Sequence, residues 1–147
     1  MLIRSPEEDD RDAWGALFAG YLAFYKAELP LAVVEHTFRR IVDQRSAIYG
    51  LVAEDEETGA LLGLTHFIFH PSSWSPTGYC YLEDLFVAPE GRGKGVGRAL
   101  IEAVEAAARE AEATRLYWVT QQDNATARRL YDALVPVSDF VQYRKAL

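Results

Sequence analysis

The sequence predicts an α/β fold in which one domain spans residues 1–147. Apolar residues recur at helical spacing in four stretches, and six shorter apolar runs have the length of strands. Hydrophobic residues make up 50% of the chain and charged residues 25%, as in an ordinary globular protein. A glycine-rich segment joins a strand-like run to a long amphipathic stretch, so the central part reads as strand, loop and helix.

The predicted helices of the first half lie on either side of a proline. Residues 14–25 and 31–44 carry apolar side chains at i, i+3, i+4 and i+7, and Pro30 separates the two stretches. The start of the first helix stays open between a cap at Ser5 and a cap at Asp9 or Asp10.

The second half contains two further helices. Residues 96–111 form a long amphipathic helix, and Asn124 caps a shorter one that Pro136 ends. Strands are expected at residues 2–3, 47–54, 60–70, 79–87, 116–120 and 137–143.

Two features near the third strand were considered for binding. His66 and His70 would lie about 13 Å apart along a strand, which is too far for one metal ion, so no metal site is predicted. Residues 71–78 read as a loop that carries Trp74. This side chain either covers a substrate or packs at the base of the loop.

The glycine-rich loop at residues 91–97 predicts a phosphate or pyrophosphate site. Glycines at alternate positions let the backbone approach a ligand, and the helix that follows adds unpaired N–H groups and its dipole. Arg92 and Lys94 add positive charge. The loop is no P-loop, because Gly95 follows Lys94, and its glycine spacing does not fit the dinucleotide fingerprint.

The loop does fit the pattern Arg-x-x-Gly-x-Gly through Arg92, Gly95 and Gly97. Together with the strand at 81–87 and with Asn124 and Tyr131, it resembles the GNAT acetyltransferase superfamily, and most closely the diamine (spermidine/spermine) acetyltransferases. The resemblance implies a GNAT fold with a mixed central sheet of six to seven strands, splayed to form a cofactor cleft, and about four helices. It also implies acetyl-CoA as the acyl donor and a homodimer.

The resemblance assigns most of the cofactor contacts to the strand and the loop. Backbone groups of the strand end would bond the pantetheine arm, the loop would hold the pyrophosphate, and an asparagine would contact CoA. The residues concerned are Leu85, Phe86, Val87, Arg92, Gly93, Lys94, Gly95, Val96, Gly97, Arg98 and Asn124.

Acetyl transfer to a primary amine needs a base, because such an amine is protonated at neutral pH. The resemblance points to Glu83, which strand alternation would place on the face of Tyr81 and Leu85 and not on that of Asp84. Asp84 either faces the substrate or bonds loop N–H groups. By the same resemblance, Tyr131 is the acid that protonates the leaving CoA thiolate.

The acceptor is expected to be a polyamine, an amino acid or a lysine side chain. Candidate residues that touch it are Tyr21, Phe24, Tyr25, Glu28, Glu83 and Asp84. The alternative interpretation of the three aromatic residues is that they belong to the core. The rival function is a regulatory module that binds acyl-CoA without turnover.

Charge and cysteine content limit partners and location. The chain has 15 Lys and Arg against 22 Asp and Glu, a net charge of −7, so it lacks the basic surface of a nucleic-acid-binding protein. The acidic excess lies mainly in the first half, where it either steers a cationic acceptor or keeps the surface solvated. The single cysteine, Cys80, and the lack of a membrane span or signal peptide predict a cytoplasmic protein.

Overall fold

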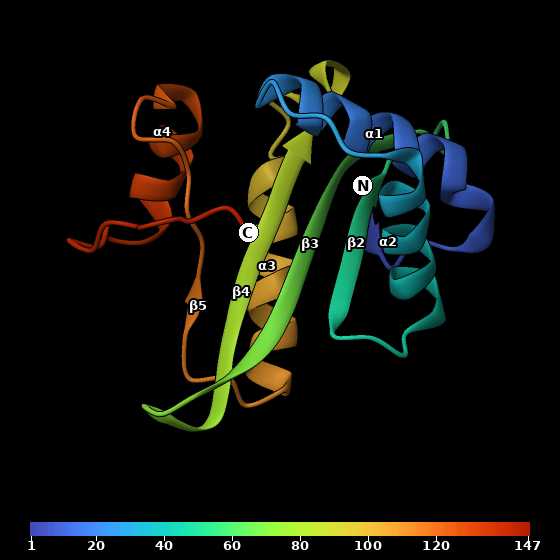
Figure 1. Ribbon diagram of the computed structural model, residues 1–147. Coiled ribbons are helices and arrows are strands. Elements are labelled where there is room, and N and C mark those ends of the chain that lie inside the picture. The colour runs from blue at the N-terminus through green and yellow to red at the C-terminus, as the bar shows by residue number, and fades with distance from the viewer.

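The computed structural model describes residues 1–147 and contains one five-stranded sheet in the order β1-β2-β3-β4-β5 (Figure 1). The first four strands pair antiparallel, and β5 pairs parallel to β4. The strands are β1 Leu2–Arg4, β2 Ile48–Glu54, β3 Leu61–Ser72, β4 Ser75–Val87 and β5 Leu116–Tyr117. The predicted mixed α/β fold is confirmed, although the sheet has five strands and not six or seven.

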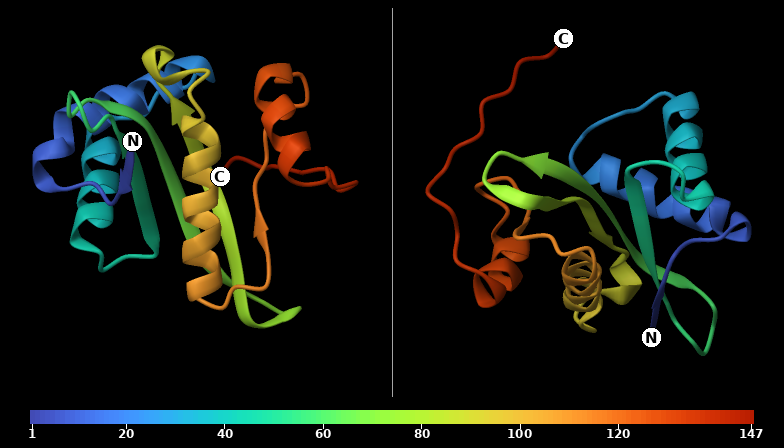
Figure 2. Two further views of the ribbon diagram at one scale, coloured as in Figure 1. Left: turned by 180° about the vertical axis from the view of Figure 1, so that it is seen from behind. Right: turned by 90° about the horizontal axis from the view of Figure 1, so that it is seen from below.

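Helices cover both faces of the sheet. Helices α1 and α2 pack on one face and α3 on the other, while α4 lies beyond β5 (Figures 1 and 2). The helices are α1 Arg11–Phe24, α2 Leu31–Asp43, α3 Val96–Glu110 and α4 Ala125–Leu134, with short 3₁₀ turns η1 Glu8–Asp10 and η2 Pro89–Gly91. No helix is both long enough and apolar enough to cross a bilayer.

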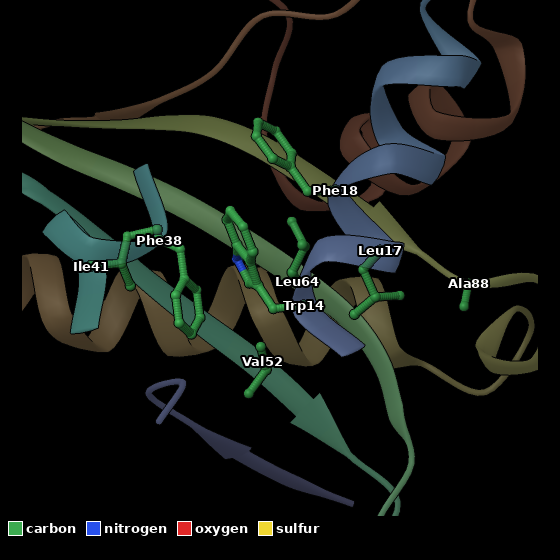
Figure 3. Packing of buried hydrophobic residues seen from close by; sticks show 8 residues of the cluster. All are labelled: Trp14, Leu17, Phe18, Phe38, Ile41, Val52, Leu64 and Ala88. Atoms are coloured by element: carbon green, nitrogen blue, oxygen red, sulfur yellow. The ribbon is translucent and has the colours of Figure 1, made fainter. Parts of the chain in front are cut away.

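The core under α1 and α2 centres on Trp14, whose ring is fully buried between Phe18 and Phe38 (Figure 3). Val52 and Leu64 close this cluster from the sheet. Because α1 contributes three large buried side chains, its position over β3 and β4 is fixed by packing. A separate core lies between the sheet and α3.

The start of α1 differs from the Ser5 alternative. Glu7 and Asp10 form a capping box around η1, and α1 follows directly with Asp10 as its N-cap residue. The carboxylate of Asp10 also pairs with Arg4, at 2.6 Å from Nη1. Asp10 thus occupies the N-cap position of the Asp9–Asp10 alternative, but its side chain accepts from the N–H of Glu7 and caps no N–H of α1.

The predicted loop at residues 71–78 is instead a hairpin tip. Strand β3 continues to Ser72 and β4 begins at Ser75, so both strands run through most of this segment. Trp74 is 89% exposed at the tip and packs on nothing. At strand rise it lies roughly 25 Å from Glu83, too far to cover a substrate there.

The C-terminal strand predicted at residues 137–143 is wrong. This segment is extended but forms no strand, and the strand predicted at 116–120 is reduced to Leu116–Tyr117. The segment pairs with no strand of the sheet, so its apolar side chains have no partner within the chain. Phe140 and Tyr143 are 90% and 92% exposed, and the segment runs away from the sheet (Figure 2).

Candidate active site

A β-bulge in β4 places two acidic side chains side by side. His66 pairs with Asp84 and the next residue, Phe67, pairs with Leu82, so Glu83 is an extra residue without a partner. Asp84 consequently faces α1, as Glu83 does, whereas Leu85 packs on the α3 side. The expectation that Glu83 shares a face with Leu85 and not with Asp84 is wrong, because the bulge interrupts the alternation.

Glu83 is a carboxylate with a perturbed pKa at the rim of the site. Its pKa is raised from the ordinary value, first by burial among protein atoms and then by the charge of Asp84, while His66 and Arg144 oppose the shift. Part of the side chain is open to solvent, so a substrate can reach it. Such a pKa suits a general base.

Asp84 does not bond the glycine-rich loop, which was one of its two expected roles. Its Oδ2 atom lies 2.8 Å from Nδ1 of His66, a buried residue of β3. Burial, the charge of Asp84 and a hydrogen bond to its carboxylate raise the pKa of Tyr21 far above the usual range of a phenol. The acidic pair therefore borders α1.

The loop before α3 presents a row of unbonded backbone donors. After Arg92, the next residue whose N–H group donates to a backbone carbonyl is Ala99, which bonds the carbonyl of Gly95. The N–H groups of residues 93–98 have no backbone partner. Gly93 and Gly95 adopt φ values of +73° and +78°, and an added Cβ atom would meet nothing within 4 Å at either glycine. The loop thus combines free donors, a helix N-terminus and open space.

The loop side chains predicted to contact the cofactor are spread around these amides. Arg92, Lys94 and Arg98 are exposed, and Nε of Arg92 donates to the carbonyl of Val87 at 3.4 Å. Val96 is buried under the first turn of α3, and Gly97 abuts Leu130 of α4. Val96 therefore offers only its backbone to a ligand.

The edge of β4 toward β5 is open beside the acidic pair. The two strands pair only at Cys80 with Leu116 and at Tyr81 with Tyr117, and they separate beyond this point (Figure 1). Residues 85–87 pair with β3 on one side and have no partner on the other. This is the splayed arrangement expected from the resemblance, and the open edge leads into the glycine-rich loop.

Helix α4 supplies the other two predicted residues. Asn124 caps the helix by accepting from the N–H of Ala127 at 3.3 Å, and its amide donates to Oγ1 of Thr120 at 3.2 Å. Tyr131 packs against Trp118 with ring centroids 5.5 Å apart. Burial, and secondarily the neighbouring Tyr25, raises the pKa of Tyr131 to about 12. Tyr131 therefore stays protonated at neutral pH.

The structure separates the four acceptor candidates of the first half. The rings of Tyr21 and Tyr25 lie between the acidic pair and α4, tilted by 59° with centroids 5.0 Å apart. Phe24 is 53% exposed and contacts Tyr25. Glu28 instead lines a cavity of about 1120 Å³ between α1 and α2, which contains neither Glu83 nor Tyr131. Glu28 is therefore not part of the cluster around the acidic pair.

Sequence reasoning missed two residues at this site. His66 was considered only as a metal ligand, although it bonds Asp84, and Arg144 carries charge toward Glu83 and Tyr81. A histidine in an otherwise apolar strand was the only signal in the sequence that could have identified His66.

No group of three or more His, Cys, Asp or Glu side chains is arranged to hold a metal ion. Cys80 is buried in the α3 core, and burial raises the pKa of its thiol to about 11, as expected for a packing residue.

Comparison with known proteins gives consistent results. The profile of the Acetyltransferase (GNAT) family matches residues 12–134. The chain is 36% identical to D-amino-acid N-acetyltransferase HPA3 of Saccharomyces cerevisiae, over 99% of this chain and 90% of that protein. It is 35% identical to aminoglycoside N(6')-acetyltransferase type 1 of Stenotrophomonas maltophilia, over 74% and 68% of the two chains. The crystal structure of a probable acetyltransferase superposes with a TM-score of 0.86 at 26% identity, covering 100% of this chain and 98% of the other.

Members of this family use acetyl-CoA. The chain therefore belongs to the GNAT family and is an N-acetyltransferase.

Proposed function

We propose that the protein transfers an acetyl group from acetyl-CoA to a cationic primary amine by direct attack in a ternary complex. The observation that carries this proposal is the bulge in β4. It sets Glu83 and Asp84 at the start of an unpaired strand edge that leads into the free amides of the loop. An acyl donor bound along that edge would have its thioester beside the two carboxylates.

The residues present fit acetyl-CoA. The loop amides and the N-terminus of α3 would hold the pyrophosphate, with Arg92, Lys94 and Arg98 adding charge. The free backbone groups of residues 85–87 would bond the pantetheine amides as a neighbouring strand does. Asn124 would contact the arm from the start of α4. The bound thioester would supply the acetyl group.

Two side chains would handle the protons of the transfer. Glu83 takes a proton from the ammonium, the amine nitrogen bonds the acetyl carbon, and the bond from that carbon to sulfur breaks. Tyr131 donates to the departing sulfur, and its phenolate regains a proton from the acetylated nitrogen, which loses its second proton as the amide forms. A phenol with a pKa of about 12 is a weak acid toward a thiolate of ordinary pKa, about 8.5, but exclusion of water raises the pKa of the thiol as well.

The acceptor class is supported by the acidic pair and by the relatives. Two adjacent carboxylates attract a cation, which fits a polyamine, an amino acid or a lysine side chain. The relatives HPA3 and the aminoglycoside acetyltransferase are named for D-amino acids and for an aminoglycoside, both of which carry amines. We favour amino acids first, because the similarity to HPA3 extends over 99% of this chain. The lone buried Cys80, which has no disulfide partner, fits a cytoplasmic location.

Release of free CoA thiol from acetyl-CoA in the presence of an amine panel tests this function. The panel contains D- and L-amino acids, spermidine, an aminoglycoside and a lysine peptide, and mass spectrometry identifies the acetylated product. Thiol release that depends on an amine supports the proposal. Binding of acetyl-CoA without amine-dependent release contradicts it.

Gly95→Ala should weaken CoA binding about tenfold or more in calorimetry. The substitution forces a side chain onto a residue with φ of +78° at the start of α3, at a cost of order 1–2 kcal/mol, and displaces the amides of the loop. Gly59→Ala is the matched control, since Gly59 has φ of +72° and equally open space but lies in the β2–β3 turn. Equal affinities in the two variants would exclude the loop as the pyrophosphate site.

Glu83→Gln should lower kcat at pH 7 by 10²-fold or more, with partial recovery as the pH rises. The native base must be ionised, so activity should increase with pH through the raised pKa of Glu83. In the variant only the growing fraction of free amine can react, which moves the profile to alkaline pH. Glu102→Gln on the exposed face of α3 is the control. A native pH profile in the Glu83 variant would assign the base elsewhere.

Tyr131→Phe should reduce kcat by about 10- to 100-fold and leave the KM for acetyl-CoA within a factor of about two. The change removes the proton donor and keeps the ring that packs on Trp118. Tyr49→Phe, on β2, should have no effect. Unchanged turnover in the Tyr131 variant would rule out its role as the acid.

We further propose that the protein is a homodimer in which the C-terminal segments of two copies are covered. Val137, Phe140, Val141 and Tyr143 are all more than 70% exposed in the single chain, and β5 leaves an open sheet edge. A segment from a second copy would bury these side chains.

Light scattering should give twice the mass of one chain, and the double substitution Phe140→Glu and Tyr143→Glu should give a monomer. Leu31→Glu, on an exposed apolar residue of α2, is the control and should stay dimeric. A native mass equal to one chain at micromolar concentration would disprove the dimer.

A further inference from the structure

A buried chain of polar groups runs from α1 through β3 to the acidic pair. Nε1 of Trp14 donates to Nε2 of His66 at 3.0 Å, and Nδ1 of His66 lies 2.8 Å from Oδ2 of Asp84. Trp14 and His66 are 0% and 2% exposed, and the side chain of Asp84 is 15% exposed. This series of hydrogen bonds therefore starts in the core and ends at the surface of the site.

The indole group sets the direction of these hydrogen bonds. A tryptophan N–H can only donate, so Nε2 of His66 must offer its lone pair. The ring proton of a neutral His66 then resides on Nδ1, where it points at the carboxylate of Asp84. Trp14 thus determines which histidine nitrogen faces the carboxylate as a donor.

Asp84 is held from more than one side. His66 donates to Oδ2 and Oγ1 of Thr65 donates to the backbone carbonyl at 2.8 Å, while Tyr21 lies near enough for the charge of Asp84 to raise its pKa. Donors to both the side chain and the bulged backbone hold the carboxylate in one orientation. The rings of Trp14 and Phe18 pack against His66, so the imidazole has no room to turn away.

We propose that His66 is a positioning residue for the acceptor: its Nδ1–H group, fixed by Trp14, holds Asp84 as an oriented anion that binds the acceptor ammonium beside Glu83. The inference rests on the proposed function and assigns a different role to each residue of the acidic pair. Asp84 anchors the cation, and Glu83 takes its proton. His66 touches neither substrate, so it acts through Asp84 alone.

The first test is the effect of His66 variants on the acceptor amine that the panel identifies. His66→Leu removes the donor, and the KM for the acceptor should rise about tenfold or more, with the KM for acetyl-CoA unchanged and kcat reduced less than threefold. His66→Asn places an amide N–H near the position of Nδ1 and should restore most of the affinity. His70→Leu is the matched control on the same strand and should behave as the native enzyme.

These kinetics distinguish positioning from packing. Equal defects in the Leu and Asn variants, or an unchanged acceptor KM in an active Leu variant, would overturn the inference. If the Leu variant does not fold, Asp84→Asn replaces it, since this variant keeps the shape of the carboxylate and removes its charge. It should show the same selective rise in acceptor KM, and a native KM would overturn the inference.

The second test does not depend on turnover. Nitrogen-15 NMR of histidine-labelled native protein should show His66 with its proton on Nδ1, with the signal identified by its loss in His66→Asn. A proton on Nε2 in the native protein would overturn the inference even if the enzyme is active. Absence of amine-dependent thiol release in the native protein would instead contradict the proposed function and leave the tautomer result intact.

Discussion

The extra residue in β4 is the constraint on which the site depends. Without it, Glu83 and Asp84 would point to opposite faces of the sheet, and only one carboxylate could meet an acceptor under α1. With it, Asp84 bonds His66 on the α1 side and Glu83 stands beside it with a raised pKa. The bulge also marks the region where β4 leaves β5, so the acidic pair and the free strand edge arise at the same place.

Packing around Trp14 connects the bulge in β4 with the proposed acceptor side of the site. Trp14 is buried between Phe18 and Phe38, and its indole N–H is satisfied by His66. The same helix therefore supplies the core of the domain, the partner of a buried histidine and, about two and three turns after Trp14, Tyr21 and the C-cap residue Tyr25 at the edge of the site. The position of Tyr21 and Tyr25 therefore depends on the packing of the core around Trp14.

The two halves of the site differ in how they are built. The donor half consists of backbone groups, namely the loop amides of residues 93–98 and the open edge of residues 85–87. Backbone donors tolerate changes in side chain, which explains why a short glycine pattern identified this half. In the proposed function the acceptor half consists of side chains from α1, β3, β4 and α4, whose identity and orientation would set which amine is accepted. A shared family fold therefore fixes the donor more firmly than the acceptor.

Local patterns were sufficient for the helices, the first four strands and the glycine-rich loop, because helical spacing, glycine conformation and capping by Asn124 act within a few residues. They were misleading where the outcome depends on a partner. Strand alternation assigned Glu83 and Asp84 to opposite faces, and an apolar pattern at residues 137–143 predicted a strand that has no neighbour to pair with. Bulges and strand pairing depend on contacts between distant segments, and the bond from Trp14 to His66 joins residues 52 positions apart. Only the folded chain could bring these groups together.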